Sequence, residues 1–316
     1  MGISFQMRAG KQGFKGTTPM KRWMTLCLRS LAVVGLVGIL MLGGPLVMLA
    51  GSSIDLDSHW STADRSAAGL APSPGEARDA IVQVYAARAF NWRGAFGVHT
   101  WIATKAENAA YYRVYEVTRW RGAVHASRQR APDRAWYGNP PQLLASYRGD
   151  AAARLITPID AAATDYPRAG QYRIWPGPNS NTFTAWVIRQ VPGLRVHLPP
   201  TAIGKDYLLE GWVAKVPSES GYQVSLGGLA GLLLARDEGI EINILGLVFG
   251  IDYAMPALKF PGIGRLGLEA SVLGQSTNDQ PGDSVETTGK EKADPLDRLF
   301  PYLVAGTGFE PMTFGL

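Results

Sequence analysis

The chain has 316 residues, of which 46% are hydrophobic and only 18% are charged, and this length is sufficient for one large domain or two small ones. The net charge of +5 does not predict nucleic-acid binding, because residues 1–29 hold six basic residues and no acidic one. The rest of the chain is therefore close to neutral.

The first predicted element is a membrane-spanning helix. Residues 30–54 contain no charged side chain, and the apolar run at 31–51 meets the ~20 residues that a bilayer requires. Basic residues precede this run, and Asp55 and Asp57 follow it, so we expect the basic residues 1–29 to stay in the cytoplasm. The pattern predicts a single-pass protein of the bacterial inner membrane, anchored by residues 30–54, with its C-terminal domain in the periplasm.

The alternative for this segment is a signal peptide that is cleaved near Ala50 and Gly51. Met48 is bulky at a position where signal peptidases prefer small residues, which favours an uncleaved anchor. Gly43, Gly44 and Pro45 weaken the helix and favour cleavage. Met20 is also a plausible natural start, which leaves open whether residues 1–19 belong to the natural protein.

Residues 55–78 are rich in Ser, Ala, Gly, Pro and Asp and predict an exposed linker. A globular extracytoplasmic domain is expected over residues 79–268. Its first strands are predicted at 80–88, 97–105 and 109–120, because aromatic and β-branched residues dominate these stretches.

Further elements follow after a polar region at 121–150. Residues 150–163 have helix potential that Pro158 interrupts, and residues 171–175 predict a short strand. Residues 180–191 predict a helix with one largely apolar face, which Asn179 or Ser180 can cap.

The last part of the domain, residues 222–267, is apolar and rich in glycine. Asp237–Gly239 predicts a turn between two apolar strands, and Glu241, Asn243 and Asp252 make a second spanning helix too short. We expect a buried hairpin here, with an apolar edge that faces the bilayer. Residues 269–316 are expected to form a disordered tail, because residues 274–297 are polar. The end of this tail resembles peptides that arise when a reading frame runs into a transfer-RNA gene, which leaves open whether residues 270–316 belong to the natural protein.

These elements together predict an α+β fold. A transmembrane helix precedes one antiparallel-sheet domain with a few packed helices.

Three residues form a candidate catalytic set. His99 lies in one predicted strand, Glu116 lies in the next, and Ser180 begins a predicted helix, where free backbone N–H groups favour an oxyanion. A base, an orienting acid and a nucleophile are the parts of nucleophilic catalysis. Each residue also has a purely structural interpretation, in which Ser180 is a helix cap, His99 is a packed core residue and Glu116 is a solvated carboxylate near Arg113 or Arg119. Asn179, Asn181 and Trp101 are further candidates at this site.

No cofactor or metal is predicted. Cys27 is the single cysteine and lies at the edge of the apolar run, so the domain has no thiol ligand. The four histidines, His59, His99, His125 and His197, show no metal-binding spacing.

Four stretches of the domain resemble an uncharacterised bacterial family, the domain of unknown function 3750. They are GVHTWIATK, YRVYEV, GPNSNTFTAWV and EGIEINILGLVFGIDYAMPALKFPGIGRLG, and the resemblance covers about residues 79–268. The family implies no established activity.

A weaker resemblance is to circularly permuted papain-like folds, such as the lecithin retinol acyltransferase-like hydrolases. In that pattern His99 matches the base, and Ser180 stands where the family has its nucleophilic cysteine. A serine hydroxyl does not ionise near neutral pH, so it needs His99 as a true general base. The resemblance therefore implies either a serine hydrolase or a site that only binds.

Three functions are compatible with these patterns. The first is a domain of papain-like fold that binds an envelope peptide or lipid without turnover. The second is a serine-dependent envelope hydrolase or acyltransferase that acts on amide or ester bonds. The third is a structural protein whose apolar hairpin contacts lipid or a partner. The sequence does not decide whether the protein is an enzyme, nor its ligand or oligomeric state.

Overall fold

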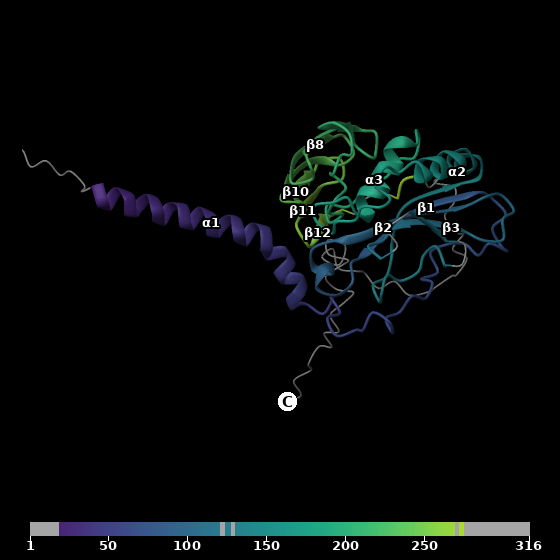
Figure 1. Ribbon diagram of the computed structural model, residues 1–316, viewed down its shortest axis with the longest axis horizontal. Coiled ribbons are helices and arrows are strands. Elements are labelled where there is room, and N and C mark those ends of the chain that lie inside the picture. Colours follow the sequence, from purple (N-terminus) through teal and green to yellow (C-terminus); the bar gives the residue numbers. More distant parts are fainter. Residues whose placement is uncertain (1–18, 121–123, 128–129, 269–271, 275–316) are drawn as a thin grey trace, which may run out of the picture. The chain divides into compact units, whose positions relative to one another are not determined.

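The computed structural model describes residues 19–120, 124–127, 130–268 and 272–274 (Figure 1). The chain divides into two units, Met1–Met41 and Leu42–Leu316. Residues 1–18 of the basic N-terminus and most of the predicted tail at 269–316 lie outside the described residues.

The first element is helix α1, Pro19–Ala50. It begins well before the predicted start at residue 30, because Pro19 suits the first helical position and the basic residues after it are good helix formers. Within the described chain, α1 is the one helix that is long and apolar enough to cross a membrane, with a mean hydropathy of 2.4.

The first sheet has five antiparallel strands in the order β4-β3-β2-β1-β5. A short 3₁₀ helix, η1 (Asn91–Ala95), connects β1 and β2. The strands are β1 (Ile81–Arg88), β2 (Val98–Lys105), β3 (Arg113–Val117), β4 (Val124–Ser127) and β5 (Gln142–Arg148).

Two helices, α2 (Gly149–Thr164) and α3 (Ser180–Gln190), cover one face of this sheet (Figure 1). Side chains alternate along a strand, so Val82 and Val84 point into the core beneath the helices, whereas Ile81 and Tyr85 belong to a second core on the opposite face. The first sheet therefore separates two cores, one on the helix side and one on the far side.

The far side is covered by segments that the sequence predicts as a linker and a polar region. The backbone N–H groups of Leu70 and Ala71 donate to the Asp133 carboxylate, at 2.7 and 3.1 Å. Ala77 and Trp136 are buried in the far core. Part of the predicted linker is therefore packed on the sheet and is not an exposed tether.

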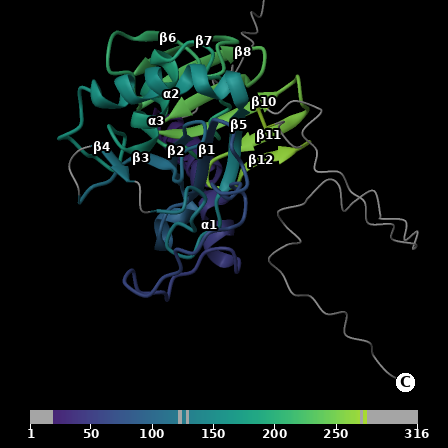
Figure 2. The ribbon, with the colours of Figure 1, turned by 90° about the vertical axis from the view of Figure 1, so that its right-hand side faces the viewer.

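The second sheet is an antiparallel meander of seven strands in the order β12-β11-β10-β9-β8-β7-β6 (Figure 2). The guanidinium of Arg189 in α3 donates to the side-chain oxygen of Gln223 in β7 at 3.1 Å, which joins the helix layer to this sheet. The strands are β6 (Val213–Lys215), β7 (Gly221–Leu226), β8 (Ala230–Ala235), β9 (Gly239–Ile244), β10 (Leu247–Asp252), β11 (Ala257–Phe260) and β12 (Gly264–Gly267).

The second sheet has an apolar outer face and an inner face on which buried polar side chains lie beside the apolar Leu233 and Ala235. The apolar outer face is formed by eight side chains of β7, β8 and β9 that are 42–61% exposed: Tyr222, Val224, Leu226, Leu232, Leu234, Ile240, Ile242 and Ile244. The strands also carry five buried polar residues between these positions and in β11: Gln223, Ser225, Glu241, Asn243 and Lys259. The predicted buried hairpin is thus buried on one face only, through Leu233 and Ala235 of β8 and Glu241 and Asn243 of β9.

The predicted α+β class, with an N-terminal apolar helix, antiparallel sheets and a few helices, is confirmed. The predicted strand at 171–175 is wrong, because these residues have no regular structure. The sequence also gave no indication of β5 inside the polar region, since Pro140 and Pro141 directly precede it.

Candidate functional site

His99 lies on the far side of the first sheet. It pairs with Ala87 of the neighbouring strand, and Ala87 belongs to the far core. Its chain neighbours Val98 and Thr100 point to the opposite side, where Val98 packs on the helix-side core. The imidazole is therefore directed away from α2 and α3.

Glu116 is the centre of the polar contacts around His99. Nε2 of His99 lies 3.3 Å from Oε2 of Glu116, and the two side chains come from the adjacent strands β2 and β3. The Arg134 guanidinium donates to both carboxylate oxygens at 3.1 and 2.9 Å, and Arg130 donates to Oε1 at 2.5 Å. The Glu116 side chain is fully buried, so these donors replace the water that would otherwise solvate its charge.

Two tryptophan rings enclose the imidazole. The rings of His99 and Trp136 stack with centroids 3.6 Å apart and an angle of 13°, and Trp101 lies 5.8 Å away. The Trp101 indole donates to the carbonyl of Pro132 at 2.7 Å, which ties β2 to the 130–137 segment. The guanidinium of Arg134 also lies over both tryptophan rings. His99 is thus held in one orientation.

The burial and charges of this cluster shift both pKa values. Burial lowers the pKa of His99 below its usual value and outweighs the opposing effect of Glu116. Burial alone would raise the pKa of Glu116, but the hydrogen bond to His99 and the charges of Arg134 and Arg130 lower it to about 2. At neutral pH the cluster contains a neutral imidazole beside an ionised carboxylate.

Ser180 lies on the other side of the sheet, at the first position of α3. The helix has a capping box, in which the Asn179 side chain accepts from the backbone of Asn181 and Thr182, and the Thr182 hydroxyl accepts from the backbone of Asn179. Ser180 is buried and interacts with Tyr172, which partly offsets the increase in the Tyr172 pKa that burial causes.

Asn181 connects the start of α3 to β2. Its side-chain oxygen accepts from the Thr100 hydroxyl at 3.0 Å, and its Nδ2 donates to the carbonyls of Val98 and Ile203 at 2.9 and 2.7 Å. Two of these three contacts, those with Thr100 and Val98, come from the residues on either side of His99, which face the helix. Asn179 and Asn181 are therefore bound by protein groups that position the helix end.

The structure brings His99, Glu116 and Trp101 together, but it does not bring His99 to Ser180. The expectation that the imidazole meets the hydroxyl depended on both lying on one face of the sheet. The register of β2 places Thr100, not His99, opposite the start of α3. In this arrangement His99 cannot take the proton of the Ser180 hydroxyl directly.

Sequence reasoning missed Arg130, Arg134 and Trp136. They lie in a region without periodicity, 130–141, whose mixture of arginines, aromatic rings and prolines indicated only a loop. One signal was available, since a carboxylate in the middle of an apolar strand such as Glu116 requires a cationic partner if it is buried.

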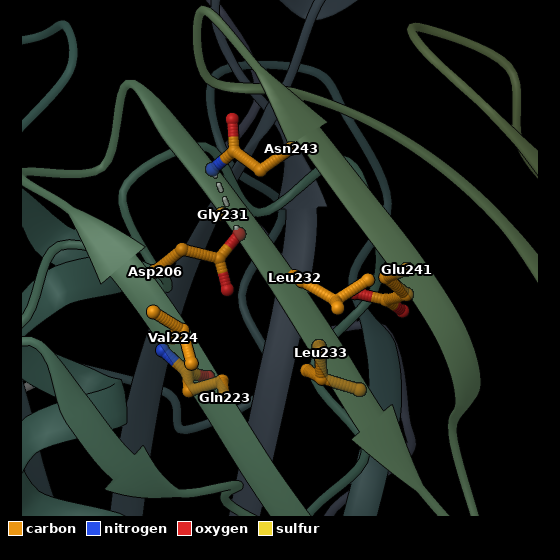
Figure 3. Close-up of a pocket in the computed structure, with 8 residues that line it drawn as sticks. All are labelled: Asp206, Gln223, Val224, Gly231, Leu232, Leu233, Glu241 and Asn243. Carbon is orange, nitrogen blue, oxygen red and sulfur yellow. Dashed lines mark hydrogen bonds between the residues drawn. The ribbon is translucent and has the colours of Figure 1, made fainter.

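Two hollows lie near the second sheet, and neither contains a predicted site residue. The first has a volume of about 10 Å³, enough for roughly one water molecule. Its polar lining includes Asp206 and Asn243, which point toward one another and are hydrogen bonded at 3.1 Å (Figure 3). The second is an open hollow of about 320 Å³ beside Arg236 and Tyr253. Within the described ranges, no group of three or more metal-binding side chains is placed to hold an ion.

The sequence model of the DUF3750 family, described as a protein of unknown function, matches residues 79–207. Residues 79–207, the DUF3750 segment, are therefore similar to this family of unknown function. The DUF3750 segment includes the first sheet, both of its covering helices and all six candidate site residues. The fourth stretch that carries the predicted resemblance, in residues 238–267, lies beyond the match.

Comparison with curated proteins finds no match, and comparison with solved structures finds none either. The similarity of the DUF3750 segment to permuted papain-like folds therefore stays a prediction.

Proposed function

We propose that this protein is a single-pass protein of the bacterial inner membrane that holds a non-catalytic binding domain in the periplasm. Its ligand would be a peptide or lipid of the cell envelope. The DUF3750 segment forms the domain's main core, and α1 is the anchor.

The charges around α1 support this topology. At ~1.5 Å per residue, a bilayer core of ~30 Å needs about 20 residues. The 32 residues of α1 therefore leave room for basic first turns outside the core. Lys21, Arg22 and Arg29 lie in this first part, and the first charged residue after α1 is Asp55. Basic residues are retained on the cytoplasmic side, so the domain after α1 would be exported.

The separation of His99 from Ser180 by the sheet is the observation that favours binding over turnover. Catalysis by a serine requires a base within hydrogen-bond reach. His99 instead lies beside Glu116 and against Trp136. Ser180 lies in a capped helix end whose neighbours are occupied by structural hydrogen bonds. These contacts favour a fixed scaffold.

The topology can be tested with the native cysteine. Cys27 is exposed in α1 between Arg22 and Arg29, so a membrane-impermeant maleimide should label it in spheroplasts only after permeabilisation. A Cys27→Ser, Thr157→Cys variant is the matched control, because Thr157 is exposed on α2 and should react from outside. Labelling of Cys27 in sealed spheroplasts would overturn the proposed orientation.

The absence of turnover can be tested separately. We expect no reaction of the folded protein with a fluorophosphonate probe. Ser180→Ala and His99→Ala variants are the comparisons. Labelling of the wild type that both substitutions abolish would overturn the binding proposal and favour a serine hydrolase or acyltransferase.

A further inference from the structure

We propose that the apolar outer face of the second sheet lies in the extracytoplasmic leaflet of the bilayer that α1 crosses. The domain would then be bound to lipid at two places, by its spanning helix and by a sheet that rests in the membrane interface. This inference depends on the proposed membrane attachment and names lipid as the ligand.

The alternation along β7 and β9 is the reverse of the one expected in water, and β8 between them is apolar on both faces, with Leu233 and Ala235 buried. An antiparallel sheet with one solvated face normally has polar side chains outside and apolar side chains inside. In β9, Ile240, Ile242 and Ile244 point outward, whereas Glu241 and Asn243 are buried. Sheets that face lipid show this reversed alternation.

The inner face contains a cluster of charges that compensate one another. Nζ of Lys205 lies 2.7 Å from Oε2 of Glu241, and Nζ of Lys259 lies 2.6 Å from its Oε1. Lys205 also pairs with Asp206 at 2.9 Å. Because buried charges require partners, this pairing fixes which side of β9 and of β11 is inside. The apolar side chains are consequently committed to the outside.

A contiguous exposed apolar surface of this kind indicates an interaction surface. Its position favours lipid as the occupant. The segment that joins β11 to β12 lies against the end of α1, where Pro45 is buried and a Cβ on Gly262 would lie 2.6 Å from the Pro45 nitrogen. The chain thus leaves the bilayer at the β11–β12 edge of the same sheet.

Aromatic residues at the margin of the sheet are also consistent with a membrane interface. Trp212 is 71% exposed beside β6, and the Tyr253 ring, beside β10, is 58% exposed. Tryptophan and tyrosine are enriched where a membrane meets water. The sheet has open edges at β6 and β12, whose backbone groups could not be satisfied in the hydrocarbon core, so the face would rest at shallow depth.

The experiment uses full-length protein in phosphatidylethanolamine–phosphatidylglycerol vesicles. Single cysteines replace Leu234, Ile242, Thr157 or Leu36 in a Cys27→Ser background, and each receives a small fluorophore. Leu234 and Ile242 are on the apolar outer face, Thr157 is on α2, and Leu36 is in α1. Lipids with a nitroxide at a shallow or a deep position of the acyl chain then act as quenchers. Equal thermal melting in detergent identifies the variants that remain folded.

We expect loss of fluorescence at Leu234→Cys and Ile242→Cys with the shallow quencher, and none at Thr157→Cys. Quenching at Leu36→Cys but not on the sheet would overturn this inference and leave the anchor intact. No quenching at any position would contradict both proposals. The fluorophores on the sheet could instead become shielded from water as protein density in the vesicles increases, without being quenched by the nitroxide lipids. This result would indicate a second copy of the chain as the occupant and would also overturn the inference.

Discussion

At the scale of single residues, the most informative group is the fully buried carboxylate of Glu116. It accepts from two arginines and lies beside a neutral imidazole. Removal of one partner from a buried ion pair leaves uncompensated charge, which costs more than the pair itself contributes. The cluster is therefore expected to be essential for stability irrespective of any ligand.

This expectation can be tested with Glu116→Gln. We predict that the free energy of unfolding falls by about 3–5 kcal/mol, because Arg134 keeps its charge in a buried position. The change is measured by denaturant unfolding in detergent. Asp160→Asn is the control, since its pair with Arg113 is 33–43% exposed and should contribute at most about 1 kcal/mol. Equal effects of the two substitutions would contradict the importance of burial.

The lowered pKa of His99 predicts how stability depends on pH. Because burial lowers the pKa of His99 in the folded chain, the unfolded chain takes up a proton on this imidazole at a higher pH than the folded chain does. Stability should therefore fall as the pH decreases below 6.5, by at most about 1.4 kcal/mol per pH unit for this one group. Melting temperatures at pH 7.5 and 5.5 measure the change, and His99→Gln should reduce it. A wild type that becomes more stable in acid would show that the folded imidazole is protonated.

At the scale of elements, substitutions of Asn179 and Ser180 at the start of α3 distinguish a structural role of these residues from a catalytic one. Asn179 accepts two backbone N–H groups and donates to the carbonyls of Ile174 and Ile203. We predict that Asn179→Ala lowers the free energy of unfolding by about 2 kcal/mol. Ser180→Ala should cost about 1 kcal/mol or less, because the hydroxyl interacts with the neutral side chain of Tyr172 and does not cap the helix. A larger effect at Ser180, measured by denaturant unfolding, would contradict this assignment.

The end of α1 offers a second matched pair of substitutions, at Gly44 and at Gly43. A Cβ on Gly44 would overlap the carbonyl of Pro261, whereas one on Gly43 would meet nothing within 4 Å. We predict that Gly44→Ala lowers the melting temperature in detergent. Gly43→Ala should leave it unchanged or raise it, because alanine favours a helix by about 1 kcal/mol over glycine. If both variants behave alike, this packing does not stabilise the domain.

The elements that the sequence predicted well have strong local signals. The strands at 81–88 and 98–105 are rich in β-branched and aromatic residues, and α3 has both an apolar face and a cap. His99 and Glu116 could be placed near one another because adjacent antiparallel strands bring such residues together. The face on which His99 lies could not be predicted, since a shift of one residue in register reverses it. Arg134 reaches Glu116 through a tertiary contact for which a loop sequence gives no periodic signal.

At the scale of the whole molecule, the second sheet gives the domain an apolar surface that needs a cover. If detergent is diluted away, we predict that the protein associates through this face. A Leu234→Lys, Ile242→Lys variant should sediment as smaller particles than the wild type. Thr157→Lys controls for added charge and for association through α1, and it should behave like the wild type. Identical sedimentation of all three proteins would show that the face does not mediate association.

The reversed side-chain orientation of the second sheet has a consequence for the order of folding. Side chains that remain solvated in the completed fold provide little hydrophobic driving force in water, so strands β7 to β9 would gain stability chiefly when an apolar medium receives them. The first sheet and its helices hold the larger aliphatic core and have no such dependence. Under the proposed membrane topology, the second half of the chain would therefore mature late, on the bilayer surface, and a domain kept away from lipid would remain partly assembled.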